Sequence, residues 1–287
     1  MQQKESVVNT YDEKPLHDEA ATLVLRVAYD GAAFSGYALQ ERQTHVRTVA
    51  GELQQALRML LRRDVALTCA GRTDAGVHAR AQHVSLPVTA QEVETIDGER
   101  LLRSLGAVLP EDVRVERVYR APVGFSARFD ARARRYRYRL VPGPVAPLFN
   151  ARWAWWLRML HAEDLDVAAM ERAAQCLVGE HDFKSFCKAA SAVDKPTCRY
   201  VEWVRLEREE ALGESMVVVD IAGNAFLHSM VRTIVGTLVE VGCGRRPEAW
   251  VAEALAACER RAAGPCAPAC GLTLWEVRYP EESLRPW

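Results

Sequence analysis

The sequence lacks any uninterrupted apolar stretch long enough to cross a lipid bilayer, and it carries almost no net charge. Its first twenty residues are polar and of mixed charge, without the apolar centre of a signal peptide. We therefore expect residues 1–20 to form a disordered tail, and the protein to be cytoplasmic with no membrane partner. The net charge of -1 over 287 residues gives no indication of a nucleic-acid partner by itself.

The cysteines also lack a pattern. None of the eight forms a Cys-x-x-Cys pair, and the two closest, Cys266 and Cys270, have no suitably spaced histidine pair beside them. One weak pair is thin evidence for structural zinc, and scattered cysteines in a chain without a secretory signal are typically reduced and buried. We predict no metal site; a zinc protein using these two residues is the alternative. Four histidines show no triad or metal pattern and are interpreted as structural: His78, His83, His181 and His228.

The order of predicted elements is the same in both halves of the chain. Hydrophobic periodicity predicts strands at 22–29, 65–70, 83–88 and 113–120, with helices at 46–62 and 99–108. It then predicts strands at 134–141, 200–206, 216–221 and 272–279, with helices at 165–177, 226–241 and 247–258. The fold class is therefore α+β: two ferredoxin-like βαββαβ units, 21–122 and 123–287, whose mostly antiparallel sheets join because each alone would leave exposed edges.

Basic residues are concentrated where the two predicted units meet. Nine arginines lie between Arg114 and Arg139, against only Glu116 and Asp130. Such clustering is expected of phosphate contacts, and a solvated charged surface is an equally good interpretation.

Asp74 stands in a long, glycine-bounded turn, Gly71-Arg72-Thr73-Asp74-Ala75-Gly76, between two predicted strands. Turn statistics alone favour a structural aspartate that caps backbone N–H groups. Two features favour chemistry instead: the glycines allow another backbone to approach closely, and Arg72 is near enough in sequence to stabilise the carboxylate charge.

Residues 134–140 alternate strictly, so Tyr136 and Tyr138 share one face of a strand and Arg135 and Arg137 the other. One of the two tyrosines is expected in the core, and the other could offer a stacking platform to a nucleobase. The aromatic cluster at 153–156 suits either an interface or core packing.

Two further segments hold candidate binding residues. In Phe125-Ser126-Ala127-Arg128-Phe129, Arg128 could contact phosphate while Phe125 and Phe129 anchor the loop. Arg232 lies inside a mostly apolar predicted helix, where a buried arginine is costly unless a carboxylate or phosphate pairs with it. Asp74 is a candidate partner for it.

Together these segments resemble the bacterial tRNA pseudouridine synthase A family, over about residues 22–280. The segment 71–78 is similar to the family's signature around its catalytic aspartate. Segments 127–138, 224–236 and 271–280 are similar to its later blocks. The resemblance implies that Asp74 is the nucleophile, that Tyr136 stacks on the target uracil and that Arg232 pairs with Asp74.

The resemblance also implies that Leu272 lines the pocket, while Arg72 and Arg128, with Phe125 and Phe129 beside them, hold the RNA. It implies conversion of uridine to pseudouridine at positions 38, 39 and 40 of the tRNA anticodon arm, by a homodimer without a cofactor. Two alternatives stay open: a pseudouridine synthase acting at other RNA positions, and a non-catalytic RNA-binding module.

Overall fold

The computed structural model describes residues 18–40, 46–159, 161–191, 193 and 195–287. Most of the predicted tail, residues 1–17, lies outside this range, whereas residues 19 and 20 already belong to the first strand. The first half contains β1 (Glu19–Tyr29), α1 (Val49–Leu61), β2 (Thr68–Cys69), β3 (His78–Thr89), α2 (Ala90–Thr95), α3 (Gly98–Val108) and β4 (Val113–Ala121).

The second half has more strands than the periodicity predicted. It contains β5 (Ala133–Gly143), β6 (Trp155–Arg158), α4 (Val167–Ala174), β7 (Gly179–Asp182), β8 (Cys198–Ala211), β9 (Glu214–Gly223), α5 (Met230–Gly242), α6 (Ala249–Ala257), β10 (Leu272–Arg278) and β11 (Arg285–Pro286). Strands β6, β7 and β11 were not predicted. The helix predicted from residue 226 begins only at Met230, and the strand predicted at 65–70 is two residues long.

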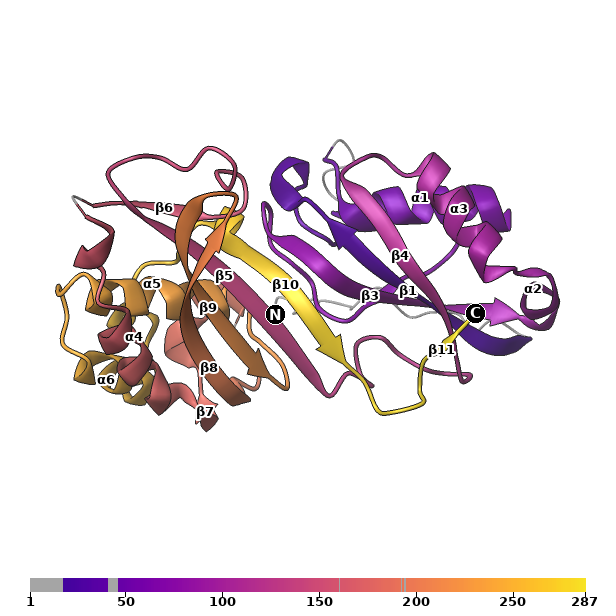
Figure 1. The fold of residues 1–287 in the computed structure, drawn as a ribbon. Helices are drawn as coiled ribbons and strands as arrows, with labels where there is room; N and C mark the ends of the chain where they lie inside the picture. The colour runs from indigo at the N-terminus through magenta and orange to yellow at the C-terminus, as the bar shows by residue number, and fades with distance from the viewer. Residues whose placement is uncertain (1–17, 41–45, 160, 192, 194) are drawn as a thin grey trace, which may run out of the picture.

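All of these strands belong to one sheet, in the order β11-β4-β1-β3-β10-β5-β9-β8-β7, with β2 on β3 and β6 on β5 (Figure 1). Pairing is antiparallel except for β10 with β3 and β5 with β6. The closing strand lies beside the first in each half, β4 next to β1 and β10 next to β5. The predicted joining of the two sheets is confirmed. The interpretation of each half as a ferredoxin-like unit stays a prediction.

The parallel contact between β10 and β3 is the seam between the halves. Thr273 and Leu274 of β10 pair there with His78 and Ala79, the first residues of β3. Beyond β10 the chain crosses back to the first half, where β11 pairs with β4 (Figure 1). The loop that ends at His78 is therefore held against a strand of the other half.

Helix α1 illustrates how the pattern of apolar residues positions the elements. Thr48 caps its start by accepting a hydrogen bond from the Gly51 N–H at 3.2 Å. Val49, Leu53 and Leu57 follow helical spacing and are fully buried, each burial contributing about 2 kcal/mol. The same cluster of buried side chains continues through the second half to Leu238 of α5, so both halves share one core. None of the described helices is long and apolar enough to cross a membrane.

Candidate active site

The loop 71–78 is held in place by contacts to the first half. The Tyr37 N–H donates to the Thr73 carbonyl at 3.1 Å, and the Tyr29 hydroxyl lies 2.7 Å from the Thr73 Oγ1. Gly36, at φ +100°, approaches so closely that a Cβ there would lie 2.9 Å from the Thr73 oxygen. The backbone directly before Asp74 is therefore held in place by the first half.

The Asp74 carboxylate faces the second half of the chain. Its Oδ2 accepts hydrogen bonds from Arg232 Nη1 and from Ser229 Oγ, both at 3.0 Å. Its Oδ1 lies 3.1 Å from His228 Nε2. The Asp74 side chain is 25% exposed, so its carboxylate is held by three partners and still reaches solvent.

The three partners come from the beginning of α5. Ser229 adopts a left-handed conformation, with φ 61° and ψ 10°, and the helix starts at the next residue. This bend turns His228 and Ser229 toward Asp74, one helical turn before Arg232. Arg232 is fixed in turn, because its Nε donates to the Ala267 carbonyl at 2.8 Å. The ion pair expected between Arg232 and Asp74 is present, and its catalytic role stays a prediction.

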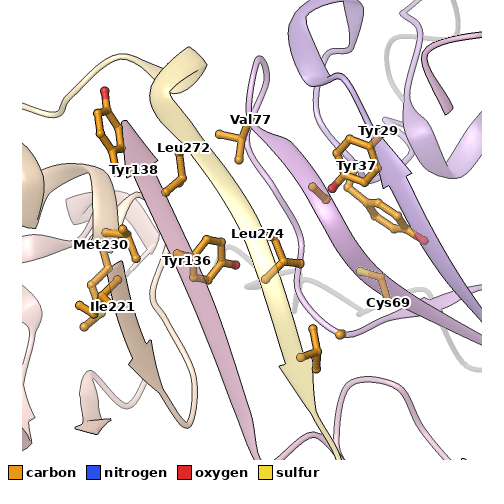
Figure 2. Close-up of a cluster of buried hydrophobic side chains, with 14 of the residues drawn as sticks. Tyr29, Tyr37, Cys69, Val77, Tyr136, Tyr138, Ile221, Met230, Leu272 and Leu274 are labelled. Atoms are coloured by element: carbon orange, nitrogen blue, oxygen red, sulfur yellow. The ribbon is translucent and has the colours of Figure 1, made fainter. Parts of the chain in front are cut away.

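Tyr136 lies on β5, next to the seam. Figure 2 shows its side chain between Ile221 and Met230 on one side and Leu274 of β10 on the other. The ring packs edge-on against Phe226 with 5.1 Å between centroids, and the residue is 8% exposed. Burial raises the pKa of Tyr136 well above its usual range, and nearby Asp74 raises it further, so the ring carries a neutral phenol.

Tyr138, two residues later on the same face, is the core tyrosine of the pair. It is fully buried, and its hydroxyl donates to the Pro268 carbonyl at 2.8 Å. Gly271 leaves room for its ring, because a Cβ there would lie 2.5 Å from the ring carbons. Of the two tyrosines, Tyr136 is the one whose surroundings include Asp74.

Arg134 is buried, so its guanidinium is not available to bind a phosphate. This corrects the prediction that placed it in a phosphate-binding cluster of arginines. Its guanidinium donates to the carbonyls of Ala70 (2.9 Å), Asn224 (2.6 Å) and Arg128. Burial lowers the pKa of Arg134. Ala70 directly precedes the Asp74 loop, and Asn224 lies on the segment leading to His228. One side chain therefore ties together the backbones that place the carboxylate and its partners.

Comparison with known proteins adds to this geometry. Residues 173–280 match the family described as tRNA pseudouridine synthase. The tRNA pseudouridine synthase A of Streptomyces griseus is 45% identical over 91% of this chain and 88% of its own length. That of Brevibacillus brevis is 44% identical over 88% of this chain and 97% of its own, and that of Cronobacter sakazakii 40% over 96% and 94%. The chain belongs to the tRNA pseudouridine synthase A family.

The predicted RNA-binding residues of this family member lie on exposed segments near the site. Arg72 and Arg128 are exposed, and the Arg128 guanidinium lies 5.2 Å from the Phe129 ring centroid. Phe125 anchors its loop by packing against Tyr279, with 5.3 Å between centroids. Phe129 is 78% exposed, so the expectation that it anchors the loop is wrong. The RNA-binding roles of all four stay predictions.

The other arginines of the predicted basic cluster on β5 face away from Asp74. Arg135 and Arg137 both pair with Asp220, each with an Nη2 to Oδ2 distance of 2.8 Å. Arg139 bonds the Thr273 hydroxyl at 3.2 Å. These side chains already have partners within the sheet, so counting arginines along the sequence overstated the basic surface of this family member.

Leu272 begins β10 and is 6% exposed, with its backbone paired to Tyr138. Its predicted contact with the uracil stays a prediction.

Within the described residues, no group of three or more His, Cys, Asp or Glu side chains is arranged to hold a metal ion. Cys270, one of the two cysteines of the zinc alternative, instead has its Sγ 3.5 Å from the Ala154 carbonyl.

The aromatic cluster at 153–156 is divided between the core and the surface. The Trp155 ring packs edge-on against Tyr138, and the Trp156 Nε1 donates to the Gly143 carbonyl at 3.0 Å, whereas Trp153 is 38% exposed. His78 and His83 are buried, as expected of structural histidines.

His228 and Ser229 are the site residues that sequence reasoning missed. His228 was interpreted as structural, and Ser229 was placed inside the helix. The available signal was their position three and four residues before Arg232, an arginine already suspected of pairing with Asp74.

Proposed function

We propose that this enzyme converts uridine to pseudouridine at positions 38, 39 and 40 of the tRNA anticodon arm, with Asp74 as the nucleophile. As a member of the tRNA pseudouridine synthase A family, it is an isomerase acting on uridine in tRNA. The three positions come from the sequence resemblance. The observation that carries the choice of Asp74 is its carboxylate, held at 3.0 Å by Arg232 and Ser229 from the other half of the chain.

The reaction breaks the bond between N1 of uracil and C1′ of ribose, turns the base, and forms a bond between C5 and C1′. C5 loses its proton and N1 gains one, so the product is an isomer of the substrate. An ionised carboxylate can attack C1′, attack C6 of the base, or remove a sugar proton to give a glycal. Each route needs a fixed, accessible carboxylate oxygen, and Asp74 offers one. No net oxidation, hydrolysis or group input occurs, so the chemistry requires no cofactor.

The neighbouring residues suit the remaining tasks. A uridine has to leave its stack to reach the enzyme, and an aromatic ring is the usual platform for an everted base. Tyr136 provides that ring beside Asp74, and Leu272 provides an apolar contact. Arg72 and Arg128 would hold phosphates on either side of the target, with Phe125 and the exposed Phe129 close to Arg128. We also propose that the enzyme acts as a cytoplasmic homodimer; light scattering would measure its mass against the 32.1 kDa of one chain.

Mapping pseudouridine in total tRNA from a strain lacking this protein tests the proposal. We expect unmodified uridine at positions 38, 39 and 40, restored by the wild-type gene and not by Asp74→Asn produced at the same level. Retention of all three modifications in the deletion strain would refute the assignment of positions. Restoration by Asp74→Asn would refute the assignment of the nucleophile, and would favour a binding role for the protein.

A further inference from the structure

A pocket of about 400 Å³ opens on the helical side of the second half, and Asp74 is not among the residues that line it. Its wall includes Arg246 and Trp250 near the start of α6, Arg260 and Arg261 just after that helix, and Glu240 near the end of α5. A volume of this order accommodates a nucleotide-sized group rather than a bare ion. Nothing in the reaction at Asp74 uses these residues.

The charges in this pocket are unbalanced. Within the described residues, none of the three arginines has a carboxylate within 4.0 Å, whereas Arg172 on α4 pairs with Glu248 at 2.6 Å. The one acid in the pocket is already engaged, because Glu240 Oε1 lies 2.8 Å from Nη1 of Arg245, which lies outside the pocket lining. In a chain with a net charge of -1, three arginines without an acidic partner around one hollow indicate an anionic ligand.

Two of the three guanidiniums are also held in place. Arg260 Nη1 donates to the Gly264 carbonyl at 2.9 Å. The Arg246 guanidinium lies 4.9 Å from the centroid of the Trp250 ring, a cation–π contact that favours this position. A planar, preorganised guanidinium presents paired N–H donors that match phosphate oxygens.

We propose that this pocket binds a backbone phosphate of the tRNA at a nucleotide other than the target uridine. The proposal rests on the proposed function, because it takes tRNA as the substrate. It adds a second contact surface on α5, α6 and the segment that follows them. Binding there would contribute to the hold on tRNA and leave the chemical step unchanged.

The pocket is connected to the active site through its own wall. The Gly264 N–H donates to Thr237 Oγ1 of α5 at 2.9 Å. The same segment continues to Ala267, whose carbonyl holds Arg232 and whose N–H donates to the Arg232 carbonyl at 3.1 Å. These hydrogen bonds hold the segment in place without a ligand in the pocket, so loss of phosphate binding there should not displace Arg232.

The test is a double variant, Arg246→Gln with Arg261→Gln. Arg260 is left intact because its bond to Gly264 contributes to the fold. We expect KM for full-length tRNA to rise about 10-fold at 0.1 M salt with kcat unchanged. The slope of log affinity against log salt concentration should become shallower by about 1 for each phosphate that the variant no longer binds.

The matched control is Arg172→Gln. It removes one positive charge, against two in the double variant, from an arginine on a neighbouring helix that is already paired with Glu248. We expect KM and the salt slope of this variant to equal those of the wild type. Equal thermal unfolding midpoints for the wild type and the double variant would exclude a folding defect as the cause.

Adenosine monophosphate, used as a free nucleotide, separates the possible sources of phosphate. If the double variant loses affinity for this nucleotide while its tRNA parameters stay at wild-type values, the pocket serves a free nucleotide and the tRNA assignment is overturned. Unchanged KM and salt slope with tRNA, with no nucleotide binding by the wild type, would overturn the site altogether. Product mapping on the wild type tests the proposed function independently, since a different modified position would leave the KM comparison intact.

Discussion

The polar groups around Asp74 differ in their exposure and hydrogen-bond partners from those of the buried framework behind them, which includes Arg134 and His83. Around Asp74 the partners are side chains that remain partly exposed: His228 at 42% and Arg232 at 18%. Behind them, Arg134 and His83 are less than 9% exposed, and Arg134 bonds backbone carbonyls rather than side chains. We therefore expect the buried groups to determine the stability of the protein and the partly exposed groups to determine the rate of the reaction.

The largest expected effect is on stability, from Arg134→Met. This change leaves buried carbonyls in separate segments without their donor, and a lost network of this kind costs about 4 kcal/mol. Urea unfolding would measure the free energy. Arg135→Met is the control: it lies on the opposite face at 28% exposure, and Arg137 still pairs with Asp220, so the expected loss is under about 1 kcal/mol. Equal losses for the two variants would contradict the distinction.

Arg232→Met should mainly change the rate. It removes a charged hydrogen bond to Asp74 Oδ2, and a bond of this type contributes about 3 kcal/mol, or roughly 100-fold in kcat. Single-turnover kinetics with the enzyme in saturating excess over tRNA would measure this loss, and Arg232→Lys should recover part of it. A drop in tRNA affinity at unchanged kcat would instead assign Arg232 to RNA binding.

His83 makes the framework sensitive to acid. Burial lowers the pKa of His83 to about 4, below the ordinary value of an unfolded chain. The unfolded state therefore takes up this proton first, so the stabilisation is complete above about pH 6.5 and is lost as the pH falls toward 4. Between pH 7 and 5 we expect the free energy of unfolding to fall by about 2 kcal/mol from this group. Urea titrations at both pH values should give a smaller difference for His83→Gln; an identical difference would exclude His83 as the source.

The smallest effect is expected from Ser229→Ala. It removes one neutral hydroxyl from Asp74 while Arg232 still contacts the same oxygen, so kcat should fall less than about 10-fold. Ser229→Gly loses the same hydroxyl but relieves the left-handed backbone, and it should be about 1 kcal/mol more stable than the alanine variant. If the alanine and glycine variants have equal kcat values but different stabilities, the rate depends on the hydroxyl and the stability on the backbone conformation. A 100-fold loss of kcat in Ser229→Ala would contradict the small effect expected here.

Local sequence patterns correctly predicted which face of an element is buried. The alternation in β5 correctly separated the buried tyrosines from the arginines, because strand geometry alone assigns those faces. The short strands β6 and β7 were missed, because four residues carry too little periodicity to be recognised.

The start of α5 shows why part of the site could not be predicted. An apolar run from Phe226 favours a helix, yet Ser229 takes a left-handed conformation that glycine normally supplies. The predicted helix therefore began too early, and His228 was not directed at Asp74. The arginine cluster shows a related limit: whether an arginine is paired depends on residues such as Asp220, which lies more than 80 positions away from Arg135 and Arg137.

The central claim is that Asp74 performs the chemistry and the rest of the site holds it in place. Tritium release from tRNA labelled at C5 of uridine, measured with saturating enzyme, tests it most directly, because release requires the new bond at C5. For Asp74→Asn we predict no release above background, with tRNA affinity within a few-fold of the wild type. Release at a rate near that of the wild type would contradict the account.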